Sequence, residues 1–277
     1  MYQINKKKEV IRVMDSNKST EASKFTGTYW QWLKSEFKGW SLAPWAIWFF
    51  GLGWQLHVYL ATGAVTVLST VTLLATLIGL LCCSAMAVGK TVNGLLGLVS
   101  AIGFIWVNAS AGHWASCLDQ VIFVALIDLP LMMTWRTWGQ NMNAKVRTMG
   151  LKGWLLVTVT VLASWFVLYE ILSIKVMQDP APVPDALVLA LGATASFLCF
   201  KHYTQTYTLW FLEDIANVAL WAWALRQGYS AAAPAMLVST LMYFASAIYG
   251  RFYSVWHTSV SGSEPKLWSD IKSVFSK

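Results

Sequence analysis

Charged side chains are scarce in this 277-residue sequence, and that scarcity excludes several classes of protein. Only 12% of the residues are Asp, Glu, Lys or Arg, whereas about a quarter are charged in an average soluble domain. The hydrophobic share is 57%, 14% of the residues are aromatic, and the mean hydropathy is +0.52. A soluble fold of this size needs more ionisable surface, and a disordered chain has far fewer aromatic residues. The composition therefore excludes both.

The sequence also lacks the motifs of common soluble enzymes and of metal sites. Its four cysteines, Cys82, Cys83, Cys117 and Cys199, lie within apolar runs, and no CxxC pair is present. Neither a zinc site nor a disulfide framework is therefore indicated. A phosphate-binding loop, an HExxH zinc motif and a GxSxG nucleophile motif are all missing. We therefore expect no cofactor, no metal and no enzymatic activity.

What the sequence does contain is a series of long, continuous apolar runs. A membrane-spanning helix needs about 20 mostly apolar residues, and strands of a β-barrel would instead alternate apolar and polar residues. The pattern predicts an all-α polytopic membrane protein with eight transmembrane helices. The predicted spans are 43–60, 64–88, 94–109, 115–135, 154–174, 186–200, 207–225 and 231–256.

The positions of Lys and Arg agree with eight spans. If both termini are cytoplasmic, all of the 20 Lys and Arg residues except Lys175 and Arg226 fall on the cytoplasmic side. This is the distribution that the positive-inside rule describes. Basic loops beside anionic lipid also account for the net charge of +7. We therefore predict a multi-pass protein in the lipid bilayer and no nucleic-acid partner.

The predicted spans fall into two blocks of three helices with one helix between them. Parallel repeats of this kind commonly hold a solute site between them near the bilayer midplane, which favours a transporter over a receptor or scaffold.

Residues 20–40 mix Trp, Phe, Leu and Lys, which favours an interfacial helix; a solvated tail is the alternative. The predicted organisation is a cytoplasmic tail with the interfacial helix (1–42), an additional N-terminal helix (43–60), a first bundle (64–138), a connecting helix (152–176), a second bundle (185–257) and a cytoplasmic tail (258–277).

Acidic residues within the predicted spans are candidates for function, because an ionised group at mid-helix costs about 2.5–3.5 kcal/mol in lipid. Asp128 and Asp214 lie deep in their spans, and we expect them to line a solute cavity; interhelical hydrogen bonding or a proton relay is the alternative. Asp119 and Glu170 lie near the ends of their spans, so we expect them to reach the headgroup region. Glu213 is rotated by about 100° from Asp214, and the two are not expected to face one cavity squarely.

Other polar and aromatic residues extend the candidate site. Trp210 and Asn217 fall on the same helical face as Asp214, and Asn93 and Gln120 offer a facing surface in the first block. Trp135 and Trp138 close that block, as part of an aromatic belt or as gating residues. Carboxylates, amides and indole faces suit a flat, polar, cationic solute, and the acids would repel a multiply charged phosphate.

Taken in order along residues 64–256, these residues resemble the PnuC family of bacterial vitamin transporters. The matching stretches of the first block are Gly79-Leu80-Leu81-Cys82, Asn93-Gly94-Leu95-Leu96-Gly97-Leu98, Gln120-Val121-Ile122-Phe123 and Trp135-Arg136-Thr137-Trp138. Those of the second are Lys201-His202-Tyr203, Leu209-Trp210, Asp214, Tyr249-Gly250 and Trp256. Residues and resemblance together give the predicted substrate-binding set: Asn93, Gln120, Asp128, Trp135, Trp210, Asp214, Asn217 and Tyr249.

The resemblance implies both a fold and a function. The fold would be the SWEET-like arrangement of three, one and three helices, with the span at 43–60 as an addition, in a homotrimer in the bacterial inner membrane. The function would be uptake of nicotinamide riboside by facilitated diffusion with alternating access, followed by trapping through cytoplasmic phosphorylation. Thiamine, riboflavin or a deoxynucleoside are the alternative solutes.

Two other classes of function are less favoured. An intramembrane enzyme could use Asp128 and Asp214 as metal ligands or acid–base groups, but the sequence has no DxxxD or HxxxH spacing. A structural membrane subunit would leave the polar groups inside the spans without a purpose.

Overall fold

The computed structural model describes residues 26–61, 63, 65–137, 146–170 and 178–257, and within them every regular element is a helix. An isolated bridge between Arg147 and Tyr203 is the one β-type pairing in these ranges. The helices are α2 (Tyr29–Glu36), α3 (Leu42–Ala61), α4 (Val67–Ala87), α5 (Asn93–Ala111), α6 (Trp114–Phe123), the π-helix η1 (Val124–Asp128), α7 (Leu129–Met133), α9 (Leu151–Leu168), α10 (Pro182–Phe200), α11 (Thr206–Gln227) and α12 (Ala233–Tyr253).

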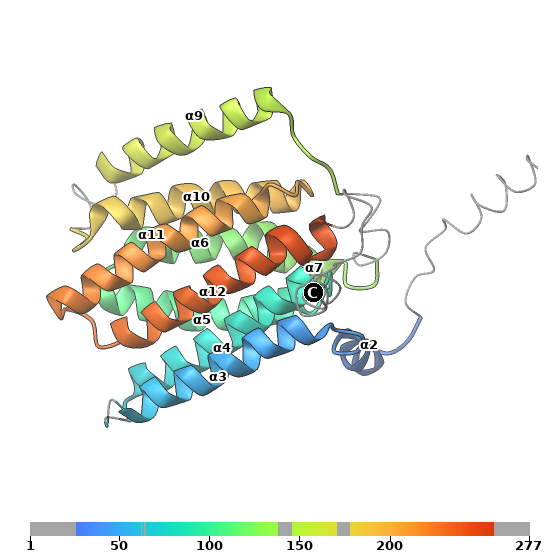
Figure 1. Cartoon of the computed structure of the whole chain (residues 1–277), viewed down its shortest axis with the longest axis horizontal. Helices are drawn as coiled ribbons and strands as arrows, with labels where there is room; N and C mark the ends of the chain where they lie inside the picture. Colours follow the sequence, from blue (N-terminus) through green and yellow to red (C-terminus); the bar gives the residue numbers. More distant parts are fainter. Residues whose placement is uncertain (1–25, 62, 64, 138–145, 171–177, 258–277) are drawn as a thin grey trace, which may run out of the picture.

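Six helical segments among the described residues are long and apolar enough to cross a membrane. They are Val67–Ala87, Asn93–Ala111, Trp114–Met133, Leu151–Leu168, Pro182–Phe200 and Ala233–His257. The all-helical membrane architecture is therefore confirmed, whereas eight spans are not reached by this measure. The two predicted spans outside the six are α3, which is rich in Trp, and α11, which carries Glu213 and Asp214; both lie alongside the others in Figure 1.

Six of the long helices form a closed ring. α4 packs against α5, α5 against α6, α6 against α10, α10 against α11, α11 against α12, and α12 again against α4. Helices α4 to α7 form one three-helix set and α10 to α12 form the other, so the sets meet along two seams, α6 with α10 and α12 with α4. α3 covers the second seam, and α9 lies outside α10 (Figure 1).

The third helix of the first set is interrupted by a π-helical segment. Pro130 has no N–H and cannot donate to the carbonyl four residues earlier. Just before it, the amide of Leu129 bonds to the carbonyl of Val124, five residues earlier, which is the π-helical pattern. Short π-helical segments of this kind are rare and often mark functional positions. The predicted span 115–135 thus ends at Met133, and Trp135 lies in the following turn.

A short helix, α2, does occupy the region predicted to hold an interfacial helix. Thr28 and Gln31 form a capping box at its start, and its Trp32 is buried against the loop between α4 and α5. The remaining parts of both predicted tails, residues 1–25 and 258–277, lie outside the described residues. The same is true of Trp138 and of residues 171–176 of the predicted connecting helix.

Candidate functional site

The ring of helices surrounds a cavity of about 160 Å³. Each of the six ring helices contributes side chains to its lining, so the site can form only when both three-helix sets are assembled. Gly79 makes room for the Tyr243 hydroxyl and the Phe104 ring, with which a Cβ atom at this position would collide. The cavity is therefore a product of the whole ring rather than of any one segment.

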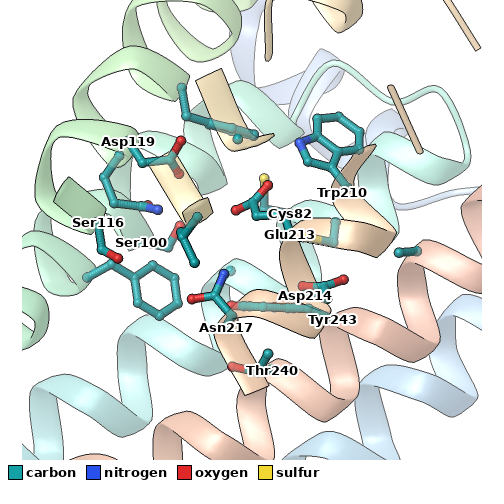
Figure 2. Close-up of a pocket in the computed structure, with 18 of the residues that line it drawn as sticks. Cys82, Ser100, Ser116, Asp119, Trp210, Glu213, Asp214, Asn217, Thr240 and Tyr243 are labelled. Carbon is teal, nitrogen blue, oxygen red and sulfur yellow. The ribbon is translucent and has the colours of Figure 1, made fainter. Parts of the chain in front are cut away.

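Three carboxylic acids, Asp119, Glu213 and Asp214, line the cavity from two facing helices, α6 and α11 (Figure 2). No Lys or Arg is among its described lining residues. The free-energy cost of burying an ionised carboxylate is normally offset by a nearby positive charge. Because the protein supplies none in this lining, the lining favours a ligand that carries positive charge.

The position of Asp119 corrects the expectation that it reaches the headgroup region. Its side chain is only 4% exposed and lies against Gly192 of α10, where any Cβ would collide with the carboxylate. Its Oδ1 atom has no hydrogen-bond partner. The position of Asp119 near the end of its predicted span did not predict the surroundings of its side chain. The reason is that α10 packs over this part of α6 and Gly192 leaves room for the acid.

Glu213 and Asp214, which were not expected to face one cavity squarely, both contribute to its lining. They do so although consecutive helical residues point about 100° apart. The reason is that α11 lies between α10 and α12, and the cavity extends along both of those neighbours.

The predicted stripe on α11 is brought together as expected. Trp210, Asp214 and Asn217 all line the cavity, and Gln120 lines it from α6. The ring of Trp210 lies with its centroid 5.1 Å from that of Tyr207 and 6.3 Å from that of Phe123. These four predicted residues therefore lie in one place, and their role in binding stays a prediction.

Asn93 and Asp128 are two predicted site residues that the cavity lining does not include. The amide of Asn93 donates to the carbonyl of Lys90 at 2.8 Å, near the start of α5. Asp128 is completely buried against Gly97 of α5, and neither of its carboxylate oxygens has a hydrogen-bond partner. The Asn93 side chain thus bonds within the α4–α5 loop region, and Asp128 packs between neighbouring helices of the first set.

Trp135 and Tyr249 are also absent from the cavity lining. Trp135 packs against Trp32 of α2, with ring centroids 5.1 Å apart. The hydroxyl of Tyr249 lies 3.0 Å from the hydroxyl of Ser41, just before α3. These two residues hold the N-terminal helices against the ring.

Sequence reasoning missed several small polar lining residues, among them Ser100 and Asn108 on α5 and Thr240 on α12. Each donates to a backbone carbonyl of its own helix: Ser100 to Gly97 at 3.0 Å, Asn108 to Phe104 at 2.9 Å and Thr240 to Met236 at 2.9 Å. A hydroxyl that donates in this way still has lone pairs with which to accept a bond from a ligand. Helical spacing along α5, where Gly97, Ser100, Phe104 and Asn108 share a face, is the signal that would have found them.

The comparisons with known proteins agree with this geometry. A family model described as "Nicotinamide mononucleotide transporter" matches residues 69–258. The chain belongs to this family. It is therefore a membrane transporter by family rather than an enzyme, and the resemblance found in the sequence is confirmed.

A curated relative and a solved structure carry the name PnuC. The chain is 22% identical over 227 residues to the nicotinamide riboside transporter PnuC of Neisseria mucosa, a match that covers 79% of this chain and 83% of the relative. It is also similar to the crystal structure of the vitamin B3 transporter PnuC, with a TM-score of 0.68 and 21% identity, over 85% of this chain and 99% of the other. At this identity the structural likeness shows that the two share a fold.

Proposed function

We propose that this chain carries nicotinamide riboside across the membrane through the cavity between the two three-helix sets. The observation that carries the proposal is the acidic lining of that cavity, contributed by Asp119, Glu213 and Asp214 without a described Lys or Arg. Nicotinamide riboside is a flat cation with a neutral sugar, and its charge complements these acids. The relative named above, which is itself called a nicotinamide riboside transporter, supports the same cargo.

The family description names the mononucleotide, whereas the cavity chemistry favours the nucleoside. A phosphate group would bring about two negative charges next to three carboxylates, and phosphate recognition usually relies on Arg, Lys or a helix N-terminus. The indole of Trp210 offers a face on which a pyridinium can stack, an interaction of about 0.5–2 kcal/mol. Gln120 and Asn217 can pair with the carboxamide or with ribose hydroxyls.

The remaining features of the proposal come from the sequence. We place eight spans in the bacterial inner membrane, with α3 as the additional N-terminal helix and the α2 end of the ring on the cytoplasmic side, where most Lys and Arg lie. The bundles at 64–138 and 185–257 would form the two halves of a uniporter that alternates its access, in a homotrimer. Phosphorylation in the cytoplasm would trap the solute. Asn93, Asp128, Trp135 and Tyr249 remain sequence predictions.

Uptake into proteoliposomes tests the proposal directly. The purified protein should take up labelled nicotinamide riboside down its concentration gradient without an ion gradient. Excess unlabelled nicotinamide riboside should block uptake, and nicotinamide mononucleotide should not. Competition by thiamine, also a cation, or by riboflavin or deoxynucleosides would instead point to one of the alternative cargoes. Absence of nicotinamide riboside uptake would exclude this assignment.

A further inference from the structure

Aromatic side chains connect the two three-helix sets at each end of the ring. At one end, the loops α5–α6 and α11–α12 have the same local structure. Each helix ends at a glycine in the left-handed conformation, Gly112 (φ 78°) or Gly228 (φ 68°), and a ring residue follows directly. These residues are His113 and Tyr229, and the His113 Nε2 atom lies 2.9 Å from the Tyr229 hydroxyl. This hydrogen bond joins the first set to the second. The backbone amides of Ala115 and Ser116 on α6, which donate to the Asp185 carboxylate on α10, join the sets at the same end.

The His113–Tyr229 pair is connected to the cavity through Trp221. His113 is completely buried and meets the indole of Trp221 edge-on, with centroids 4.7 Å apart, and Trp221 lines the cavity. Tyr229, His113 and Trp221 thus form a column from the half-buried loop to the cavity. Burial lowers the pKa of His113 to about 4, although Asp185 opposes the shift, so its ring is neutral near pH 7 and has one nitrogen to donate and one to accept.

A second column closes the opposite end. Residues 254–257 follow α12, and among them Trp256 is 2% exposed and donates from Nε1 to the carbonyl of Met86 on α4 at 3.2 Å. Its ring stacks on that of His202 in the α10–α11 loop, at 6.3 Å and 29°, and meets Tyr207 edge-on at 6.1 Å. Met86 and Tyr207 both line the cavity. This contact again joins the two sets.

A carrier whose two halves enclose a solute must open one end while the other stays closed. The seam helices α6 with α10 and α12 with α4 run the length of the ring, whereas the two columns are local and each contains a single hydrogen bond between the sets. We propose that His113 and Tyr229 form the outer gate and Trp256 forms the inner gate, and that each cycle breaks one contact while the other holds. This proposal rests on the proposed transport function and its orientation.

A natural reporter for the gates lies inside the cavity, because Cys83 lines it. In a variant that keeps only this cysteine, with Cys82, Cys117 and Cys199 replaced by Ala, a membrane-impermeant thiol reagent reports which end is open. Spheroplasts expose the outer end and inverted membrane vesicles expose the inner end. No transported substrate is needed, so failure of the nicotinamide riboside assignment would be distinguishable from failure of the gates.

We expect Tyr229→Phe, which removes only the hydroxyl, to speed labelling from the outside by about 2- to 10-fold, the range that one lost hydrogen bond gives. Trp256→Phe should speed labelling from the inside only. Tyr59→Phe on α3, which removes a hydroxyl away from this cavity, is the matched control and should change neither rate. Unchanged rates in both gate variants, or equal changes from both sides, would overturn the proposal. Reversed sidedness would support the two gates but invert the proposed topology.

Discussion

Replacement of Trp210 by Ala tests whether its indole binds a cation. The ring lines the cavity beside Glu213 and Asp214 and is held by Tyr207 and Phe123. A cation–aromatic contact contributes about 0.5–2 kcal/mol, and each 1.4 kcal/mol changes affinity about tenfold. We therefore expect Trp210→Ala to raise the Kd for nicotinamide riboside by about 2- to 30-fold, and Trp210→Phe to raise it less.

Isothermal titration calorimetry on the purified protein measures this change. Trp223→Ala is the matched control, since Trp223 lies on the same helix but is exposed on its outer side. Dihydronicotinamide riboside, which has nearly the same shape and no charge, separates the cation contribution from shape. Its affinity should fall less than that of the cation in Trp210→Ala. Equal losses for both ligands, or an equal effect of Trp223→Ala, would refute the reasoning.

Three further outcomes are expected. Glu213→Gln and Asp119→Asn should each weaken cation binding in calorimetry and relax the exclusion of the mononucleotide, because each removes a negative charge from the cavity; unchanged selectivity would contradict this. Gly192→Ala should lower Tm by roughly 2–12 °C, because its Cβ collides with the Asp119 carboxylate, whereas Gly53→Ala, with open space, should not. Burial, followed by the neighbouring Asp185, raises the pKa of Asp179 to about 8, so the folded protein binds its proton more tightly than the unfolded chain. Stability should therefore fall as pH rises from 5 to 8, and Asp179→Asn should reduce that slope in thermal melts; an unchanged slope would exclude Asp179 as its source.

The fold class could be read from the sequence because it depends on local properties. A run of about 20 apolar residues must satisfy its backbone within its own segment in lipid, so each such run becomes a helix. The stripe of Trp210, Asp214 and Asn217 was likewise predictable, since helical periodicity places residues at i−4 and i+3 on one face. Composition identifies α3 and α11 less clearly as membrane spans. Trp residues in α3 and acidic residues in α11 lower their hydropathy, although both helices pack into the bundle.

Which acids face the cavity was decided by tertiary structure. Asp119 and Asp128 lie in the same predicted span, and sequence reasoning placed Asp128 in the cavity and Asp119 at the membrane surface. In the packed structure Asp119 lines the cavity beside Gly192 of α10, whereas Asp128 is buried against Gly97 of α5 and is not among the lining residues. The amino-acid sequence determines where each helix forms and which side chains share a face of it. The direction in which that face points depends on contacts between helices distant in sequence, and periodicity carries no information about them.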